Sequence, residues 1–192
     1  MLRNSFFVLV LAFVLVNSAL ALTCPDLVSY EPNNLIQFLK AHGRNADADC
    51  VSQAITRLGG FRTPSGADVL VDLLDFRRPD SPGEKLHLFD PHDKFPAVPA
   101  LFSIGFPAVP ALLSKLQSGE ASEVIRANGI RTIVTIYRDN PPEAIAALMK
   151  AAAAANTETE AVRLESCAKD GVSFCGKSWK DRCEAALTAA NR

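Results

Sequence analysis

One short sequence motif occurs twice, close together in the chain, and limits the folds that this chain can adopt. Residues Phe95 to Leu101 have the sequence FPAVPAL, and Phe106 to Leu112 repeat this motif at an offset of eleven residues. Proline is tolerated in the first turn of a helix, where its missing N–H has no partner to lose, so each copy is predicted to open a helix. Gly105 is predicted to end the first helix. The spacing therefore favours a helical hairpin over residues 95–117.

The same apolar spacing recurs along the rest of the chain. In the second copy, apolar residues stand at i, i+3, i+4 and i+7, which is one face of a helix. Gly59 and Gly60 are predicted to stop a helix, and Thr63 is predicted to cap the next one. No stretch alternates with period two, so the sequence predicts an all-α fold. The predicted helices cover 32–43, 47–58, 63–74, 120–138 and 140–155, followed by a closing pair whose capping boxes lie at 157–160 and 178–181.

The first 21 residues are predicted to be a secretory signal peptide. Arg3 precedes an apolar run from Phe6 to Val16, and Ala19-Leu20-Ala21 supplies the small-residue cleavage pattern. A spanning helix needs about 20 apolar residues, which is longer than this run, so a membrane anchor is not expected. Cleavage leaves a single domain over 22–192 with no membrane span and a secreted or periplasmic location.

The charge of the mature chain does not favour nucleic acid as the partner. After removal of the signal peptide, 19 basic and 21 acidic residues remain, which gives a net charge of −2. The two signs are interspersed, and no basic block stands out. Another protein is the expected partner.

All five cysteines lie in the predicted mature part and are expected to form disulfides after export. Cys24 precedes the first helix and Cys50 lies in the first turn of the next, so a bond between them would tie down the N-terminus. Cys167 and Cys183 lie on the apolar stripes of consecutive helices, which favours a second disulfide between them. Cys175 would then have no disulfide partner. The alternative, in which the turn around Cys175 folds back on either neighbour, stays open.

Residues 77–94 interrupt the helical pattern with three prolines and are predicted to form an inserted loop. His87, Asp90 and His92 could supply a metal site, although their spacing matches no established zinc pattern and a solvated loop is the simpler interpretation. Together with Phe89 they could contact a partner, because insertions in repeat proteins often bind. The loop is expected to be dispensable for folding and required for binding.

The helical units resemble the HEAT-like repeats first described in phycobilisome lyases. Gly105–Leu113 is similar to the turn and second helix of that repeat, Val124–Ala127 to the start of its first helix, and Ala54–Gly59 to the end of one. The resemblance covers residues 47–155 and departs from the family in the inserted loop, the terminal cysteines and the lack of a regular Asp/Arg ladder. It implies an α-solenoid of stacked hairpins with capping helices. Proteins of this architecture mostly bind other macromolecules along a concave face.

The sequence thus predicts an exported, non-enzymatic protein-binding or scaffolding module that needs no cofactor. Arg126 and Arg131 are candidates for lining the concave face, although ordinary surface charge on a helix is the simpler interpretation. No Gly-x-Ser-x-Gly motif is present, and Cys175 is more simply explained as a disulfide or idle thiol than as a nucleophile. The alternatives are an enzyme or chromophore-attaching lyase, suggested only by the family's founding members, and a metal-binding protein that uses residues 87–93.

Overall fold

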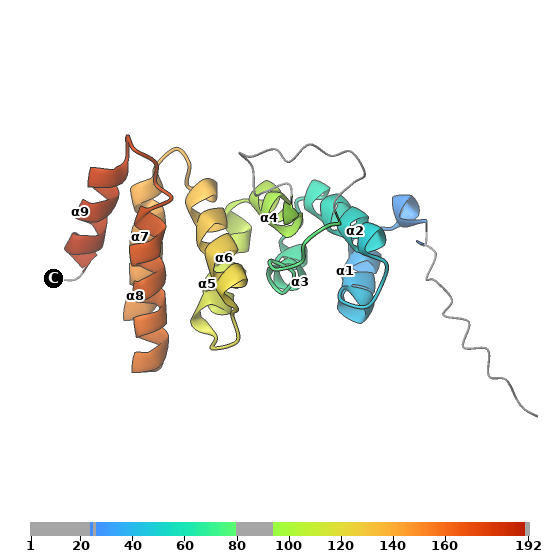
Figure 1. Ribbon diagram of the computed structural model, residues 1–192, viewed down its shortest axis with the longest axis horizontal. Coiled ribbons are helices and arrows are strands. Elements are labelled where there is room, and N and C mark those ends of the chain that lie inside the picture. The colour runs from blue at the N-terminus through green and yellow to red at the C-terminus, as the bar shows by residue number, and fades with distance from the viewer. Residues whose placement is uncertain (1–23, 25, 80–93, 191–192) are drawn as a thin grey trace, which may run out of the picture.

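The computed structural model describes residues 24, 26–79 and 94–190, and every regular element within these ranges is a helix. The prediction of an all-α fold is confirmed for this part of the chain. Figure 1 shows the helices following one another along the long axis, from α1 and α2 at one end to α9 at the other. The α-helices are α1 (Pro32–His42), α2 (Ala48–Gly60), α3 (Ala67–Val71), α4 (Ala97–Ile104), α5 (Val109–Gln117), α6 (Glu123–Ile136), α7 (Pro141–Ala153), α8 (Glu158–Val172) and α9 (Lys180–Ala190), and the 3-10 helices are η1 (Leu27–Ser29), η2 (Pro64–Gly66) and η4 (Phe106–Ala108).

The α-helices form two layers. In the first layer α2, α4, α6 and α7 pack side by side, and in the second layer α1, α3, α5 and α8 do so. The pairs α1/α2, α3/α4, α5/α6 and α7/α8 join the layers, and α9 packs against α7 and α8. The buried apolar side chains form one cluster that extends from Leu27 to Cys183, so a single core holds both layers together.

The repeated stretch turns a corner at Gly105, and the hairpin predicted for it is wrong. Both copies do open helices, with Pro96 preceding α4 and Pro110 in the first turn of α5. Gly105 ends α4 with φ at 76°, in the left-handed region that favours glycine. The chain bends by 114° there, so α4 packs against α2, α3 and α6, whereas α5 packs against α3, α6 and α8. The two copies of the motif therefore lie in different layers, α4 in the first and α5 in the second.

The bent pair is also the one apolar stretch of the described residues with the length of a membrane span. Ala97–Ile104 and Phe106–Gln117 meet the length and hydropathy of a span only when taken together across the bend. Within the described residues, no one helix meets both criteria by itself.

α2 continues through both glycines that were expected to end it. Gly59 is buried against α4, and a Cβ atom built on it would lie 2.5 Å from the Cα atom of Ala100. A Cβ atom on Gly60 would meet no atom within 4 Å. The first glycine therefore permits a close helix contact, and α2 ends at the second, two residues later than predicted. α3 ends at Val71 and is shorter than predicted; Leu73 and Leu74 are buried in the turns that follow it.

Two threonines precede helices, but only one of them caps its helix. The Thr157 hydroxyl accepts a hydrogen bond from the Glu160 N–H at 3.2 Å, and the Glu160 carboxylate accepts one from the Thr157 N–H at 3.3 Å, which completes the predicted capping box. The cap predicted for Thr63 is wrong, because its hydroxyl lies 3.0 Å from the hydroxyl of Ser65 and accepts no backbone N–H.

We expect Thr157→Ala to lower the free energy of unfolding by about 1 kcal/mol, because the Glu160 N–H loses its acceptor. Thr63→Ala is the matched control and should change it by less than about 0.5 kcal/mol, since no cap is lost. Denaturant unfolding followed by circular dichroism measures both values. Equal losses at the two positions would contradict the difference between the two caps.

Candidate functional site

Three hollows follow one another along the second layer and share lining residues, and we call them together the second-layer groove. The first hollow, of about 560 Å³, lies between the end of α1 and α3. The second, of about 250 Å³, lies between α3 and α5, and the third, of about 330 Å³, lies between α5, α6 and α8. Asp68, Asp72 and Lys115 line both the first and the second, and Ser118 lines both the second and the third. The groove therefore runs across all four helices of the second layer.

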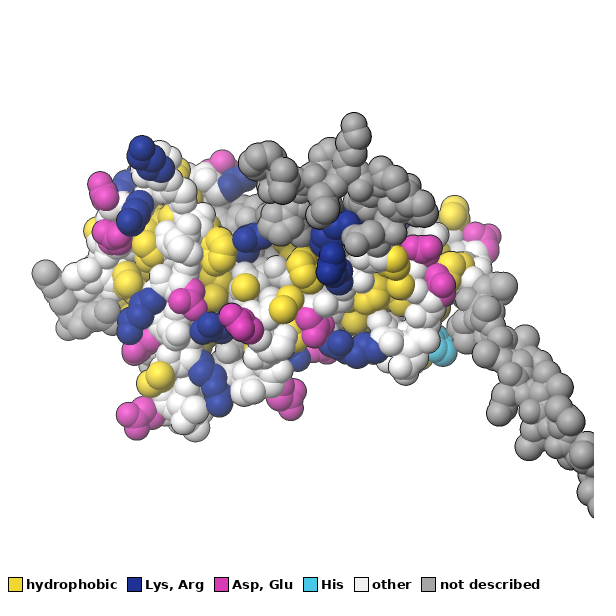
Figure 2. All heavy atoms as spheres, viewed as in Figure 1, with side chains coloured by type: hydrophobic (Ala, Val, Ile, Leu, Met, Phe, Trp, Pro, Cys, Tyr) yellow, Lys and Arg dark blue, Asp and Glu magenta, His cyan; other side chains and the backbone are white. Residues whose placement is uncertain are grey.

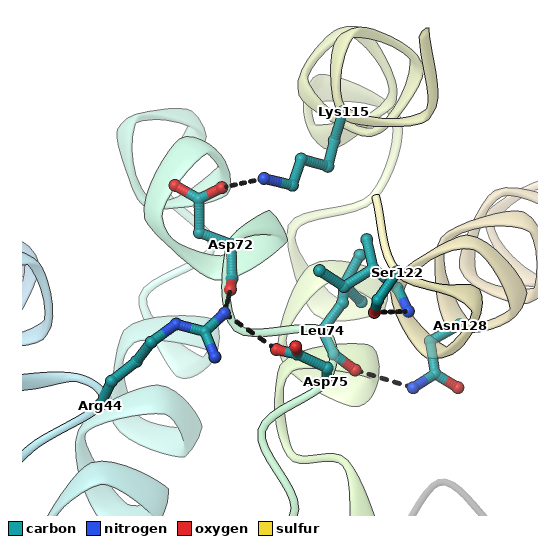
Figure 3. Close-up of polar contacts among 8 residues, drawn as sticks. Arg44, Asp72, Leu74, Asp75, Lys115, Ser122 and Asn128 are labelled. Carbon is teal, nitrogen blue, oxygen red and sulfur yellow. Dashed lines mark hydrogen bonds and ion pairs between the residues drawn. The ribbon is translucent and has the colours of Figure 1, made fainter. Parts of the chain in front are cut away.

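An ion pair between Lys115 and Asp72 separates the first hollow from the second. The Lys115 Nζ atom lies 2.7 Å from Asp72 Oδ1 and so joins α5 to the end of α3 (Figure 3). Val109, Leu112 and Leu116 form the buried stripe of α5, and Lys115 stands at the edge of that stripe. Only 16% of the Lys115 side chain is exposed, against 63% for Asp72. The lysine stem is thus packed, as amphipathic lysine stems commonly are, and its ammonium pairs with a carboxylate that faces solvent.

Arg44 closes the first hollow from the α1 side. It lies in the loop after α1, and its Nη2 atom donates to the Asp72 carbonyl oxygen at 2.7 Å and to Asp75 Oδ1 at 3.0 Å (Figure 3). Behind it, the buried Asn128 side chain of α6 donates to the Leu74 carbonyl oxygen at 2.7 Å. Exposed ion pairs of this kind contribute about 0 to 1 kcal/mol each, so they position the wall of the groove more than they stabilise the fold.

Hydrogen bonds between α5 and α8 hold the third hollow. The Gln117 amide donates to Glu160 Oε2 at 3.0 Å, and this bond holds the pKa of Glu160 below its usual value. Arg163 of α8 donates from Nη1 to the Gln117 carbonyl oxygen at 3.2 Å. The end of α5 is therefore fixed to the start of α8, with the Arg163 side chain lining the hollow between them.

The two arginines proposed as partner-binding residues lie in different surroundings. Arg126 lines the third hollow and also a neighbouring hollow of about 360 Å³, and its Nη1 atom lies 3.2 Å from Asp170 Oδ2 and 3.4 Å from Ser166 Oγ. The Arg131 guanidinium lies over the ring of Phe174, 5.1 Å from its centroid. Arg126 therefore belongs to the second-layer groove, whereas Arg131 covers an aromatic ring beside it.

The predicted metal ligands His87, Asp90 and His92 and the predicted contact residue Phe89 lie outside the described residues. The base of this insertion is described: the Arg78 N–H donates to the Lys94 carbonyl oxygen at 3.0 Å. The two ends of the insertion therefore meet, as a loop that leaves and re-enters the helical stack requires. Its metal-binding and partner-binding roles stay predictions.

Two cysteine pairs lie at disulfide distance. Cys24 is bonded to Cys50, the pair favoured from the sequence, with their Cα atoms 5.2 Å apart. The favoured bond between Cys167 and Cys183 is wrong, because Cys183 is bonded to Cys175 and the buried Cys167 is free. Gly176, with φ at 74°, reverses the chain after Cys175 and brings that turn back onto α9. Cys175 therefore has no free thiol to act as a nucleophile.

The cluster of Cys24, Asp47 and Cys50 has the size of a metal site, but each member has another partner. Their ligand atoms lie within 4.8 Å of one another. The two sulfur atoms are bonded together, and Asp47 caps α2 by accepting hydrogen bonds from the N–H groups of Asp49 and Cys50. This cluster is a disulfide beside a helix cap.

We expect the native protein to resist alkylation at Cys167. The thiol is fully buried, and its burial raises the pKa to about 11, so almost no thiolate forms at pH 8. Unfolding without reductant should expose one reactive thiol, and reduction should expose four more. Mass spectrometry of the labelled peptides identifies each site. Labelling of Cys175 before reduction would contradict the pairing.

Arg44, Asp72 and Lys115, the charged side chains that divide and close the groove, were not predicted from the sequence. Asp72 and Lys115 are 43 residues apart, and Arg44 and Asp72 are 28 apart, so no local motif joins them. One signal was present, since Lys115 lies beside the apolar stripe of a predicted helix.

Comparison with known proteins identifies no relative. No family model, curated protein or solved structure matches this chain. The resemblance to HEAT-like repeats therefore stays a prediction, and function is inferred from the groove.

Proposed function

We propose that this protein is an exported, non-enzymatic binding module that holds a segment of another protein in the second-layer groove. The observation that carries the proposal is the succession of three neighbouring hollows, which share lining residues, across α1, α3, α5 and α8. A row of shallow, neighbouring hollows suits an extended segment, whereas a small-molecule site is a single concave pocket that encloses most of its ligand. The two layers of successive helices support a HEAT-like solenoid, whose extended surfaces serve for binding.

The charge of the groove suits a protein segment. Its lining carries basic residues such as Lys115 and acidic residues such as Asp68. Figure 2 shows both signs interspersed, with hydrophobic side chains between them, over the face drawn there. Nucleic-acid binding relies on a patch or stripe of basic residues, but a polypeptide can match both signs at once.

The ion pairs of the groove support binding over catalysis. Lys115 pairs with Asp72, Arg44 with Asp75, and Arg126 with Asp170. Each pair links two elements of the stack, so these charges fix the helices that form the surface. The alternatives are a lyase-like enzyme, which rests only on the family resemblance, and a metal-binding protein that uses residues 87–93, which lie outside this groove.

Two observations support export. Two cysteine pairs at disulfide distance are compatible with an oxidising compartment, where such bonds persist. The first 21 residues carry the pattern of a signal peptide. Together they favour a secreted or periplasmic protein.

A photo-crosslinking experiment tests the proposed groove. A photoreactive amino acid at Ser114, an exposed residue that lines the second hollow, should yield one discrete adduct in the exported fraction of the source cells. The same amino acid at Thr188, exposed on α9 away from the groove, should yield none. Adducts of equal yield at both positions, or none at either, would overturn the proposal.

A further inference from the structure

The polar side chains of the third hollow are mainly hydrogen-bond donors. Among the described residues that line this hollow, the charged ones are Arg126 and Arg163, and the other polar ones are Ser118 and Ser166. The Ser118 hydroxyl donates to the Lys115 carbonyl oxygen at 2.9 Å. The Ser166 hydroxyl accepts from Arg126 and keeps its own hydrogen atom to donate. An anionic group therefore fits this hollow better than a cationic one.

The two arginines differ in what already balances their charge. Arg126 forms an ion pair with Asp170 at 3.2 Å, so its charge is balanced within the protein. Arg163 is half-buried and forms no ion pair within the described residues; its Nη1 atom donates to an uncharged acceptor, the Gln117 carbonyl oxygen. Glu160, one turn earlier on α8, instead accepts from the Gln117 amide and completes the helix cap. Arg163 thus supplies an unbalanced positive charge after these pairs are counted.

Arg163 is also held in one position. Its hydrogen bond to Gln117 fixes one side of the guanidinium, and a Cβ atom built on Gly119 would lie 2.9 Å from Nη2, so the group lies directly against this glycine. The next residue, Glu120, lines the second hollow and not the third. A guanidinium has five N–H donors, and those that Gln117 does not use suffice to bind both oxygens of a carboxylate.

The apolar part of the third hollow indicates which carboxylate would fit. Leu116, Ala121 and Val162 line it, and the Val162 side chain is 57% exposed next to Arg163 in the chain. The C-terminal residue of a protein carries its carboxylate and its side chain on the same carbon atom, so an apolar terminal residue matches a guanidinium beside apolar side chains. The third hollow is also the last of the row, because α8 is the last helix of the second layer.

We propose that the third hollow binds the C-terminal residue of the segment held in the second-layer groove, with its carboxylate on Arg163 and an apolar side chain against Val162. This inference rests on the proposed function and adds a chain direction to it. The end of the segment lies at α8, and the residues before it lie toward α3 and α1.

An N-acetyl amino acid tests the site on the full mature chain labelled with nitrogen-15. N-acetyl-leucine carries a terminal carboxylate and an apolar side chain, and N-acetyl-leucinamide is the matched probe without the carboxylate. In an NMR titration, N-acetyl-leucine should shift the signals of the Gly119 N–H and the Arg163 Nε–H saturably, with the millimolar Kd expected for a ligand of about 12 non-hydrogen atoms. The amide should shift neither signal. Equal shifts with both probes would overturn the inference.

A third probe separates a chain end from an acidic side chain. The N-acetyl α-amide of glutamic acid carries a carboxylate only on its side chain. It should bind about tenfold more weakly than N-acetyl-leucine, because it buries no apolar side chain beside Val162. Equal affinity of the two probes would overturn the assignment to a chain end.

Two variants test the placed guanidinium. Arg163→Gln should lose about tenfold in affinity for N-acetyl-leucine. Gly119→Ala keeps every charge but displaces the end of the Arg163 side chain, and it should lose about threefold. Arg182→Gln, exposed on α9, is the control and should bind as the unaltered protein does. Melting curves check that each variant folds. Unchanged affinity in the two test variants would overturn the inference.

The two proposals fail in different ways. If the Ser114 adduct forms but N-acetyl-leucine shifts neither signal, the groove holds its segment by other contacts and only this inference falls. If N-acetyl-leucine binds as expected but no adduct forms at Ser114, the carboxylate site stands and the extended groove falls.

Discussion

Gly59→Ala is expected to lower the free energy of unfolding by about 3 kcal/mol, which for a domain of this size lowers Tm by about 6 to 12 °C. The added Cβ atom would lie 2.5 Å from the Cα atom of Ala100 and 2.6 Å from its Cβ atom. Backbone cannot move aside as the end of a flexible side chain can, so α2 and α4 must separate. Because these helices are neighbours in the first layer, the separation also loosens the contacts around them.

The adjacent glycine is the matched control for this substitution. Gly60 lies in the same last turn of α2, is exposed, and has no atom within 4 Å of its Cβ position. Gly60→Ala should therefore raise the free energy of unfolding by about 0.5 to 1 kcal/mol through helix propensity alone. Thermal melts followed at 222 nm compare the two variants. A Gly59→Ala protein that melts with the unaltered protein would show that α2 and α4 do not approach so closely.

Removing the bond between Cys24 and Cys50 is expected to cost about 3.5 kcal/mol, against about 2.5 kcal/mol for the bond between Cys175 and Cys183. The first bond closes a sequence separation of 26 residues and the second closes only 8. A longer closed loop restricts the unfolded chain more, so the N-terminal bond has the larger effect. Each pair is replaced by two alanines, and denaturant unfolding measures the loss.

Cys167→Ala is the control for these double variants. It removes a buried sulfur atom without removing a disulfide, and a loss of about 1 kcal/mol is expected from the lost packing. If Cys175→Ala with Cys183→Ala cost no more than Cys167→Ala, the second bond would not be present in the folded protein.

The repeated motif at residues 95–112 shows which features of the fold are predictable from local sequence. It predicted two helix starts and one helix end, and the structure has all three. The capping box at Thr157 and the pairing of Cys24 with Cys50 were likewise available from the sequence. Helix starts and caps depend on residues within one turn of each other, so they can be predicted from residues that are neighbours in the sequence.

Which helix surfaces contact one another depends on packing between distant parts of the chain. An apolar stripe says that one face of a helix is buried but not against which helix, so the 114° bend at Gly105 and the separate layers of α4 and α5 were not predictable. The role of Gly59 depends on Ala100 of another helix, and the choice of Cys175 over Cys167 depends on where one turn folds back. The second-layer groove has the same origin, because Arg44, Asp72 and Lys115 come together only when three helices pack. Contacts between residues far apart in the chain are set by packing, which the local pattern of a sequence does not record.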